Sequence, residues 1–133
     1  MARFDHLAVP VRDTSASRDW YVDNLGLAVE FEIPERLTVA VRDSHDFTLF
    51  LHQAEVPLSP GGFALYFQVA DVDELHRELS RRGVQFDHAP MQVYWGYGAE
   101  LTDPNGYHVR LWDERTMTGT RNASVQNALE GDG

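Results

Sequence analysis

The feature that most constrains the fold is a pattern that occurs twice along the chain. In each half an alternating apolar segment leads to an aspartate, a helix-like stretch and a glycine. The matched positions are Leu7 and Leu65, Val9 and Phe67, Val11 and Val69, Asp13 and Asp71, and Gly26 and Gly83. An internal repeat of this length indicates two similar supersecondary units, each too small to bury its own sheet well alone.

The first half predicts a strand, a helix and three further strands. Apolar and other residues alternate from Phe4 to Val11, which is typical of a half-buried strand. Asp13 or Thr14 can cap a helix that Gly26 ends. Strand-like runs then cover residues 28–33, 37–42 and 47–52.

The second half predicts the same order of elements. A strand is expected at residues 64–69, and Asp71 with Glu74 forms a pair typical of a helix start. Gly83 should end this helix. Strands are expected at residues 84–86, 97–102 and 108–112, with a turn at 103–106 between the last two.

These elements predict an α+β protein of two βαβββ modules with curled mixed sheets. The first module should cover residues 1–56 and the second residues 63–115. Residues 57–62 read as a linker because they are rich in proline and glycine. Residues 116–133 are polar and patternless, so we expect a disordered tail.

Composition excludes several classes of function. The net charge of −10 disfavours nucleic-acid binding, which relies on cationic side chains at phosphates. There is no cysteine, so disulfides and thiol chemistry are excluded. We find no apolar run long enough to span a membrane and no signal-peptide pattern, and we therefore expect a cytoplasmic protein.

Three stretches resemble the vicinal-oxygen-chelate superfamily of glyoxalases, bleomycin-resistance proteins and extradiol dioxygenases. They are residues 5–9 with the helix ending at 24–27, residues 65–73, and residues 95–96 followed by 103–112. The resemblance is strongest to the bleomycin-resistance branch, in which a Trp-Gly pair like Trp95-Gly96 occurs. It implies a glyoxalase-like fold in which two modules form a concave cleft, and the sequence leaves open whether these are the two modules of one chain or modules of two chains in a dimer.

The resemblance also implies four metal-ligand positions, typically His and Glu, on the first and last strand of each module. These positions match His6, Phe50, Ala64 and Arg110 in this chain. Only His6 keeps a ligand, and the cation Arg110 would repel a metal. We therefore predict no metal and no other cofactor. A displaced zinc site formed by His6, His52 and His108 is the weaker alternative.

The residues predicted to bind a ligand follow from strand alternation around such a cleft. They are His6, Phe50, His52, Tyr66, Trp95, Tyr97, His108, Arg110 and Trp112. Aromatic rings with a few polar groups are typical of pockets for organic molecules. The sequence leaves open whether Tyr66 and Trp112 line a pocket or fill the core, and whether Arg110 instead pairs with Glu100 or Asp113.

These observations favour a metal-independent binding protein that sequesters a small aromatic or cationic molecule such as an antibiotic. The alternative is an enzyme, either a metal-dependent lyase, isomerase or dioxygenase with displaced ligands or a metal-free catalyst. No nucleophile and base can be recognised from spacing, so catalysis ranks lower and no catalytic residue is assigned. Relatives of this length usually pair, so we expect a homodimer.

Overall fold

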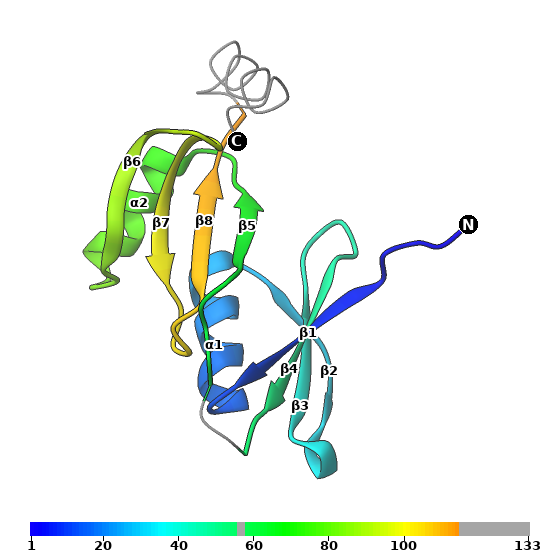
Figure 1. Cartoon of the computed structure of the whole chain (residues 1–133). Coiled ribbons are helices and arrows are strands. Elements are labelled where there is room, and N and C mark those ends of the chain that lie inside the picture. The colour runs from blue at the N-terminus through cyan, green and yellow to red at the C-terminus, as the bar shows by residue number, and fades with distance from the viewer. Residues whose placement is uncertain (56–57, 115–133) are drawn as a thin grey trace. The chain divides into compact units, whose positions relative to one another are not determined.

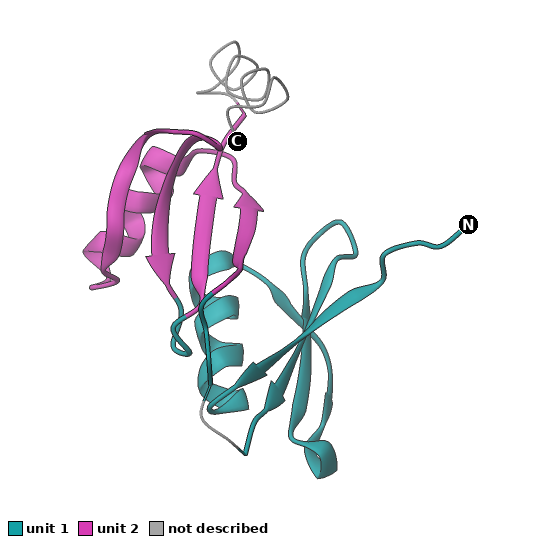
Figure 2. Cartoon of the chain, in the orientation of Figure 1, with its two compact units in different colours: residues 1–61, 103–106 teal, residues 62–102, 107–133 magenta. Residues whose placement is uncertain are grey.

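The computed structural model describes residues 1–55 and 58–114. Its contacts divide the chain into two compact units (Figure 2). Unit 1 comprises residues 1–61 and 103–106, and unit 2 comprises residues 62–102 and the described chain from 107 onward. The predicted tail, residues 116–133, lies outside the described residues.

Unit 1 is a four-stranded mixed sheet with one helix. Its elements are β1 (His6–Val11), α1 (Thr14–Leu25), β2 (Ala28–Ile33), the short 3-10 helix η1 (Pro34–Arg36), β3 (Thr38–Arg42) and β4 (Thr48–Gln53). The strand order is β1-β4-β3-β2, with β1 and β4 parallel and the other pairs antiparallel. Helix α1 packs mainly against β3 and β4.

Unit 2 repeats this topology (Figure 1). Its elements are β5 (Ala64–Gln68), α2 (Val72–Arg81), β6 (Phe86–Val93), β7 (Gly96–Thr102) and β8 (His108–Trp112). The strand order is β5-β8-β7-β6, again with one parallel pair at the first strand. The predicted α+β fold of two βαβββ modules is therefore confirmed. The predicted strand at residues 84–86 is misplaced, because β6 begins only at Phe86 and continues to Val93.

The starts of both helices and the end of α1 have the capping groups that the sequence predicts, whereas α2 has Arg82 at its C-cap, one residue before Gly83. The Asp13 carboxylate accepts a hydrogen bond from the backbone N–H of Ala16, and Asp71 does the same for Glu74. Each bond satisfies a backbone donor that the first helical turn leaves free. Gly26 ends α1 with φ of 71°, a left-handed conformation that glycine adopts without strain.

Strand alternation sends one apolar row of each sheet under its helix. The buried side chains of these rows include Val9, Leu49 and Leu51 in unit 1 and Leu65, Val109 and Leu111 in unit 2. The intervening residues lie on the open face of each sheet, where β1, β4, β5 and β8 carry most of the predicted site residues. No helix among the described residues is long and apolar enough to cross a membrane.

Candidate functional site

The predicted site residues of unit 1 form an aromatic cluster on the open face of its sheet. The ring of His6 stacks on Phe50 with centroids 4.0 Å apart. Phe31 from β2 meets the same Phe50 ring edge-on at 5.4 Å. The Asp5 carboxylate lies 2.9 Å from His6 Nδ1. The imidazole is therefore part of an aromatic surface.

The register of unit 1 separates His6 from His52. His6 pairs with Thr48 in the parallel ladder, four residues before His52 on β4. At about 3.3 Å per residue this is roughly 13 Å along the strand, whereas the ligands of one zinc ion lie within about 4 Å of one another. His52 instead lies 3.2 Å from the Thr38 hydroxyl. The displaced site of His6, His52 and His108 has no support in this register.

In unit 2 the side chains gather around Arg110. Its guanidinium carbon lies 5.3 Å from the ring centroid of Tyr66 and 5.6 Å from that of Trp95. The two rings meet edge to face, 5.5 Å apart. Nη1 donates to the hydroxyls of Tyr66 and Tyr94. A guanidinium close to two aromatic rings makes cation–π contacts with both, which hold it in one place.

Glu100 on β7 joins Arg110 to His108. Its Oε1 accepts from Arg110 Nε at 2.6 Å, and its Oε2 lies 3.1 Å from His108 Nδ1. Burial alone would raise the pKa of the Glu100 carboxyl, but the hydrogen bond and charge of Arg110 lower it below its ordinary value. Arg110 therefore pairs with Glu100, one of the two partners that the sequence left open, and part of its charge is neutralised within the unit.

A glycine explains how Trp95 reaches this cluster. A Cβ at Gly98 would lie 2.5 Å from the nearest indole carbon of Trp95 and 2.2 Å from the backbone oxygen of Leu111. The ring therefore lies over the backbone of β7, which only glycine permits at this position. Sequence reasoning did not identify Gly98, although a glycine inside a strand often marks such a close approach.

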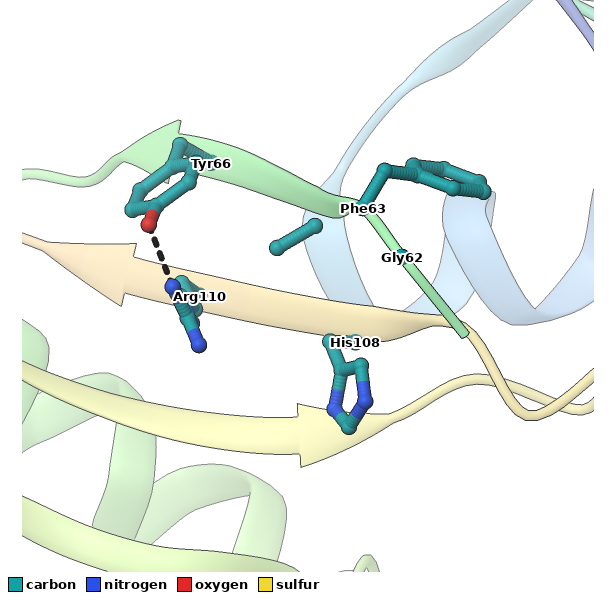
Figure 3. A pocket seen from close by; sticks show the side chains of 6 residues that line it. Gly62, Phe63, Tyr66, His108 and Arg110 are labelled. Carbon is teal, nitrogen blue, oxygen red and sulfur yellow. Dashed lines mark hydrogen bonds between the residues drawn. The ribbon is translucent and has the colours of Figure 1, made fainter. Parts of the chain in front are cut away.

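A hollow of about 310 Å³, open to solvent, lies next to the Arg110 cluster (Figure 3). Its lining residues are Gly62, Phe63, Ala64, Tyr66, His108 and Arg110. Tyr66 is 47% exposed, so it lines this hollow and does not fill the core. Burial of its hydroxyl raises the pKa of Tyr66, against the lowering effect of Arg110. The phenol therefore stays protonated at neutral pH.

Tyr97 and Trp112, which are also predicted to bind a ligand, do not line the hollow. Tyr97 points toward α2, where its hydroxyl donates to Asp73 at 2.7 Å. Tyr97 lies two and four residues before the buried Ala99 and Leu101 and so shares their face of β7, which means that strand periodicity could have placed it on the helix side. Trp112 is half-buried on the Arg110 face, and it does not line the hollow. We leave Tyr97 out of the candidate site.

The four positions that the resemblance implies for a metal do not fit one. Phe50 and Ala64 offer no ligand atom, and the Arg110 guanidinium is a permanent cation. The remaining residue, His6, stacks on Phe50. A single imidazole is too few ligands for a divalent ion at these positions.

Comparisons with known proteins agree with the topology. A family model of the Glyoxalase/Bleomycin resistance protein/Dioxygenase superfamily matches residues 3–111. Among curated proteins, no sequence matches the chain. Solved structures with the same fold include a possible glyoxalase from Bacillus cereus, with 21% identity and a TM-score of 0.72, covering 84% of this chain and 99% of that one.

Two further solved structures differ in function from each other. The antibiotic binding protein TnmS3 from Streptomyces sp. CB03234 is 27% identical, with a TM-score of 0.72, and the match covers 85% of this chain and 96% of that one. A lactoylglutathione lyase from Agrobacterium tumefaciens is 19% identical, with a TM-score of 0.69, covering 87% and 96%. With the family model spanning most of its length, this chain belongs to the glyoxalase, bleomycin-resistance and dioxygenase superfamily.

Proposed function

We propose that this protein binds a small aromatic molecule without a metal, on the open face of the unit 2 sheet. The observation that carries the proposal is the placement of Arg110 against both Tyr66 and Trp95, beside a solvent-open hollow. Aromatic surfaces supply stacking area, and one fixed cation supplies orientation, which is the usual composition of a pocket for organic ligands.

The hydrogen bonds that Arg110 already makes indicate which kind of polar group the ligand would carry. Nε donates to Glu100, and Nη1 donates to Tyr66 and Tyr94. Nη2 has no hydrogen-bond partner within the described part of unit 2. A ligand with a carboxylate or phenolate can accept from it, while the aromatic body lies against Tyr66 and Trp95. This local charge outweighs the acidic surface, whose field is screened over about 8 Å at physiological salt.

As the natural ligand of this site we favour an antibiotic. The support is the 27% identity to an antibiotic binding protein and the absence of ligand atoms at Phe50 and Ala64. The lyase among the structural relatives shares the fold alone. One fold hosts many chemistries, so the residues of the site carry more weight than the fold.

The test is calorimetric titration of the full chain with a matched pair of probes, 2-naphthoate and 2-naphthylmethylammonium. Naphthoate should bind more tightly, and Arg110→Ala should weaken its binding by at least about tenfold, since a hydrogen bond to a charged group is worth about 1.5–3 kcal/mol. Trp95→Ala should weaken both probes. Addition of EDTA should leave all affinities unchanged.

Arg42→Ala is the matched control, because Arg42 is a half-exposed arginine of unit 1 whose guanidinium contacts Asp46. This variant should bind naphthoate like the wild type. Equal affinity in the wild type and Arg110→Ala would refute the assigned role of Arg110. Loss of binding in EDTA would favour the metal-dependent enzyme instead.

A further inference from the structure

Three side chains of types that bind metals converge on the open face of unit 2, and none of them stands at the four positions that the family resemblance implies. They are Asp87 on β6, Glu100 on β7 and His108 on β8. One ligand atom from each lies within 4.8 Å of the other two, and the described residues contain no other group of three or more His, Asp or Glu side chains this close. We propose that these residues bind a divalent first-row transition-metal ion such as Zn²⁺.

An irregularity in β6 brings Asp87 into this group. Phe86 pairs with Leu101 and His88 pairs with Glu100, so two steps along β6 correspond to one step along β7. Asp87 is the extra residue of a β-bulge, a feature that re-aims a side chain within a sheet. In a regular ladder the side chain of Asp87 would lie on the opposite face of the sheet from those of Phe86 and His88. The bulge instead directs the Asp87 carboxylate toward β7.

Thr102 fixes the orientation of Asp87. Its hydroxyl donates to Asp87 Oδ2 at 2.8 Å, and Thr102 is the direct register partner of His108. The aspartate is thereby held next to the strand pair that carries the imidazole. Hydrogen bonds of this kind to a ligating carboxylate orient it and raise metal affinity.

The charge balance of the group favours a cation. Asp87 and Glu100 carry two negative charges, and Arg110 compensates one of them through Glu100 Oε1. Glu100 Oε2, which faces His108 at 3.1 Å, is the oxygen left for an ion. An ion can therefore enter between Oε2 and the imidazole without breaking the Arg110 pair. The protein's net charge of −10 adds a weak long-range attraction.

Only a small movement of the side chains is needed to bring the three ligand atoms to the spacing that a zinc ion requires. Ligand atoms around a zinc ion with bonds of about 2.1 Å lie roughly 3.5 Å apart, whereas Glu100 Oε2 and His108 Nδ1 lie 3.1 Å apart and all three ligand atoms lie within 4.8 Å of one another. The His108 side chain is 45% exposed and Asp87 lies at the surface, so side-chain rotation can supply the difference. One imidazole with two carboxylates suits Zn²⁺, Mn²⁺ or Fe²⁺ better than Mg²⁺ or Ca²⁺, which prefer oxygen alone. The ligand proposed above does not require this ion.

The experiment is calorimetric titration of ZnCl₂ into the full chain after removal of metal with EDTA and dialysis. We expect one saturable site in the wild type. His108→Ala and Asp87→Asn should each weaken it by at least about tenfold, since loss of even an outer partner costs 10–100-fold. His45→Ala, a change at an exposed histidine of the turn before β4, should bind like the wild type. Circular dichroism checks that each variant is folded.

Three results would overturn the site: no saturable zinc binding by the wild type, equal affinity in His108→Ala and Asp87→Asn compared with the wild type, or loss of binding in His45→Ala. Because Asp87→Asn changes one surface carboxylate, it remains informative if His108→Ala fails to fold. None of these outcomes depends on naphthoate binding.

Discussion

The phenolic hydroxyl of Tyr21 donates a hydrogen bond of 2.6 Å to Asp103 Oδ2, joining residues 82 positions apart within unit 1. Both side chains are buried, at 1% and 5% exposure. Asn105 also contributes, donating its backbone N–H to Oδ1 and its side-chain amide to Oδ2. A buried carboxylate needs such donors, because leaving it unsatisfied costs free energy. This network explains why residues 103–106 group with unit 1.

Tyr21→Phe should lower the free energy of unfolding by about 1–3 kcal/mol, because it removes one donor from a buried carboxylate and leaves the ring packing in place. Thermal or urea unfolding measures the change. Tyr94→Phe is the control, since Tyr94 is 67% exposed and its change should stay within about 0.5 kcal/mol. Equal losses in both variants would show that the Tyr21–Asp103 bond contributes nothing specific.

Gly98→Ala should destabilise the protein by about 1–3 kcal/mol or more, because the new methyl group would overlap the Leu111 backbone oxygen and the Trp95 ring. The displacement of the indole should also change tryptophan fluorescence and weaken naphthoate binding. At Gly61 an added Cβ would meet no atom within 4 Å, so Gly61→Ala is the matched control. If Gly98→Ala matches this control in both readouts, the packing of Trp95 over β7 is refuted.

Glu100→Gln should increase the affinity for naphthoate about twofold to fivefold, because it removes the negative charge that partly neutralises Arg110. A screened, partly exposed charge pair is worth roughly 0.5–1 kcal/mol, which corresponds to this change. The affinity for 2-naphthylmethylammonium should not rise. Glu32→Gln, which alters an ion pair with Arg18 in unit 1, serves as the comparison. A fall in naphthoate affinity would mean that Glu100 chiefly positions Arg110.

We also propose that the protein is a homodimer. Unit 1 exposes Phe4, Phe31 and Phe47 at 70%, 38% and 41%, and stable interfaces bury about 1,200–2,000 Å² with aromatic residues enriched at their centre. Light scattering at micromolar concentration should therefore report about twice the chain mass of 15.1 kDa. A particle of chain mass that persists at higher concentration contradicts the prediction.

Much of the fold could be predicted because its signals are local. Asp13, Asp71 and Gly26 perform the capping roles that their residue types favour, and the alternation in β1, β5 and β8 correctly separates the helix face from the open face. Such signals depend on a few neighbouring residues. They therefore appear in the sequence without knowledge of any distant contact.

The sequence by itself determined the repeated βαβββ order, the two faces of each sheet and the placement of Tyr66, His108 and Arg110 on one face. The tertiary structure alone decided the rest. A bulge in β6 re-aims Asp87, and a close approach at Gly98 seats Trp95 beside Arg110. Periodicity counts residues along one strand, whereas these outcomes depend on how neighbouring strands pair, and a single bulge shifts that pairing.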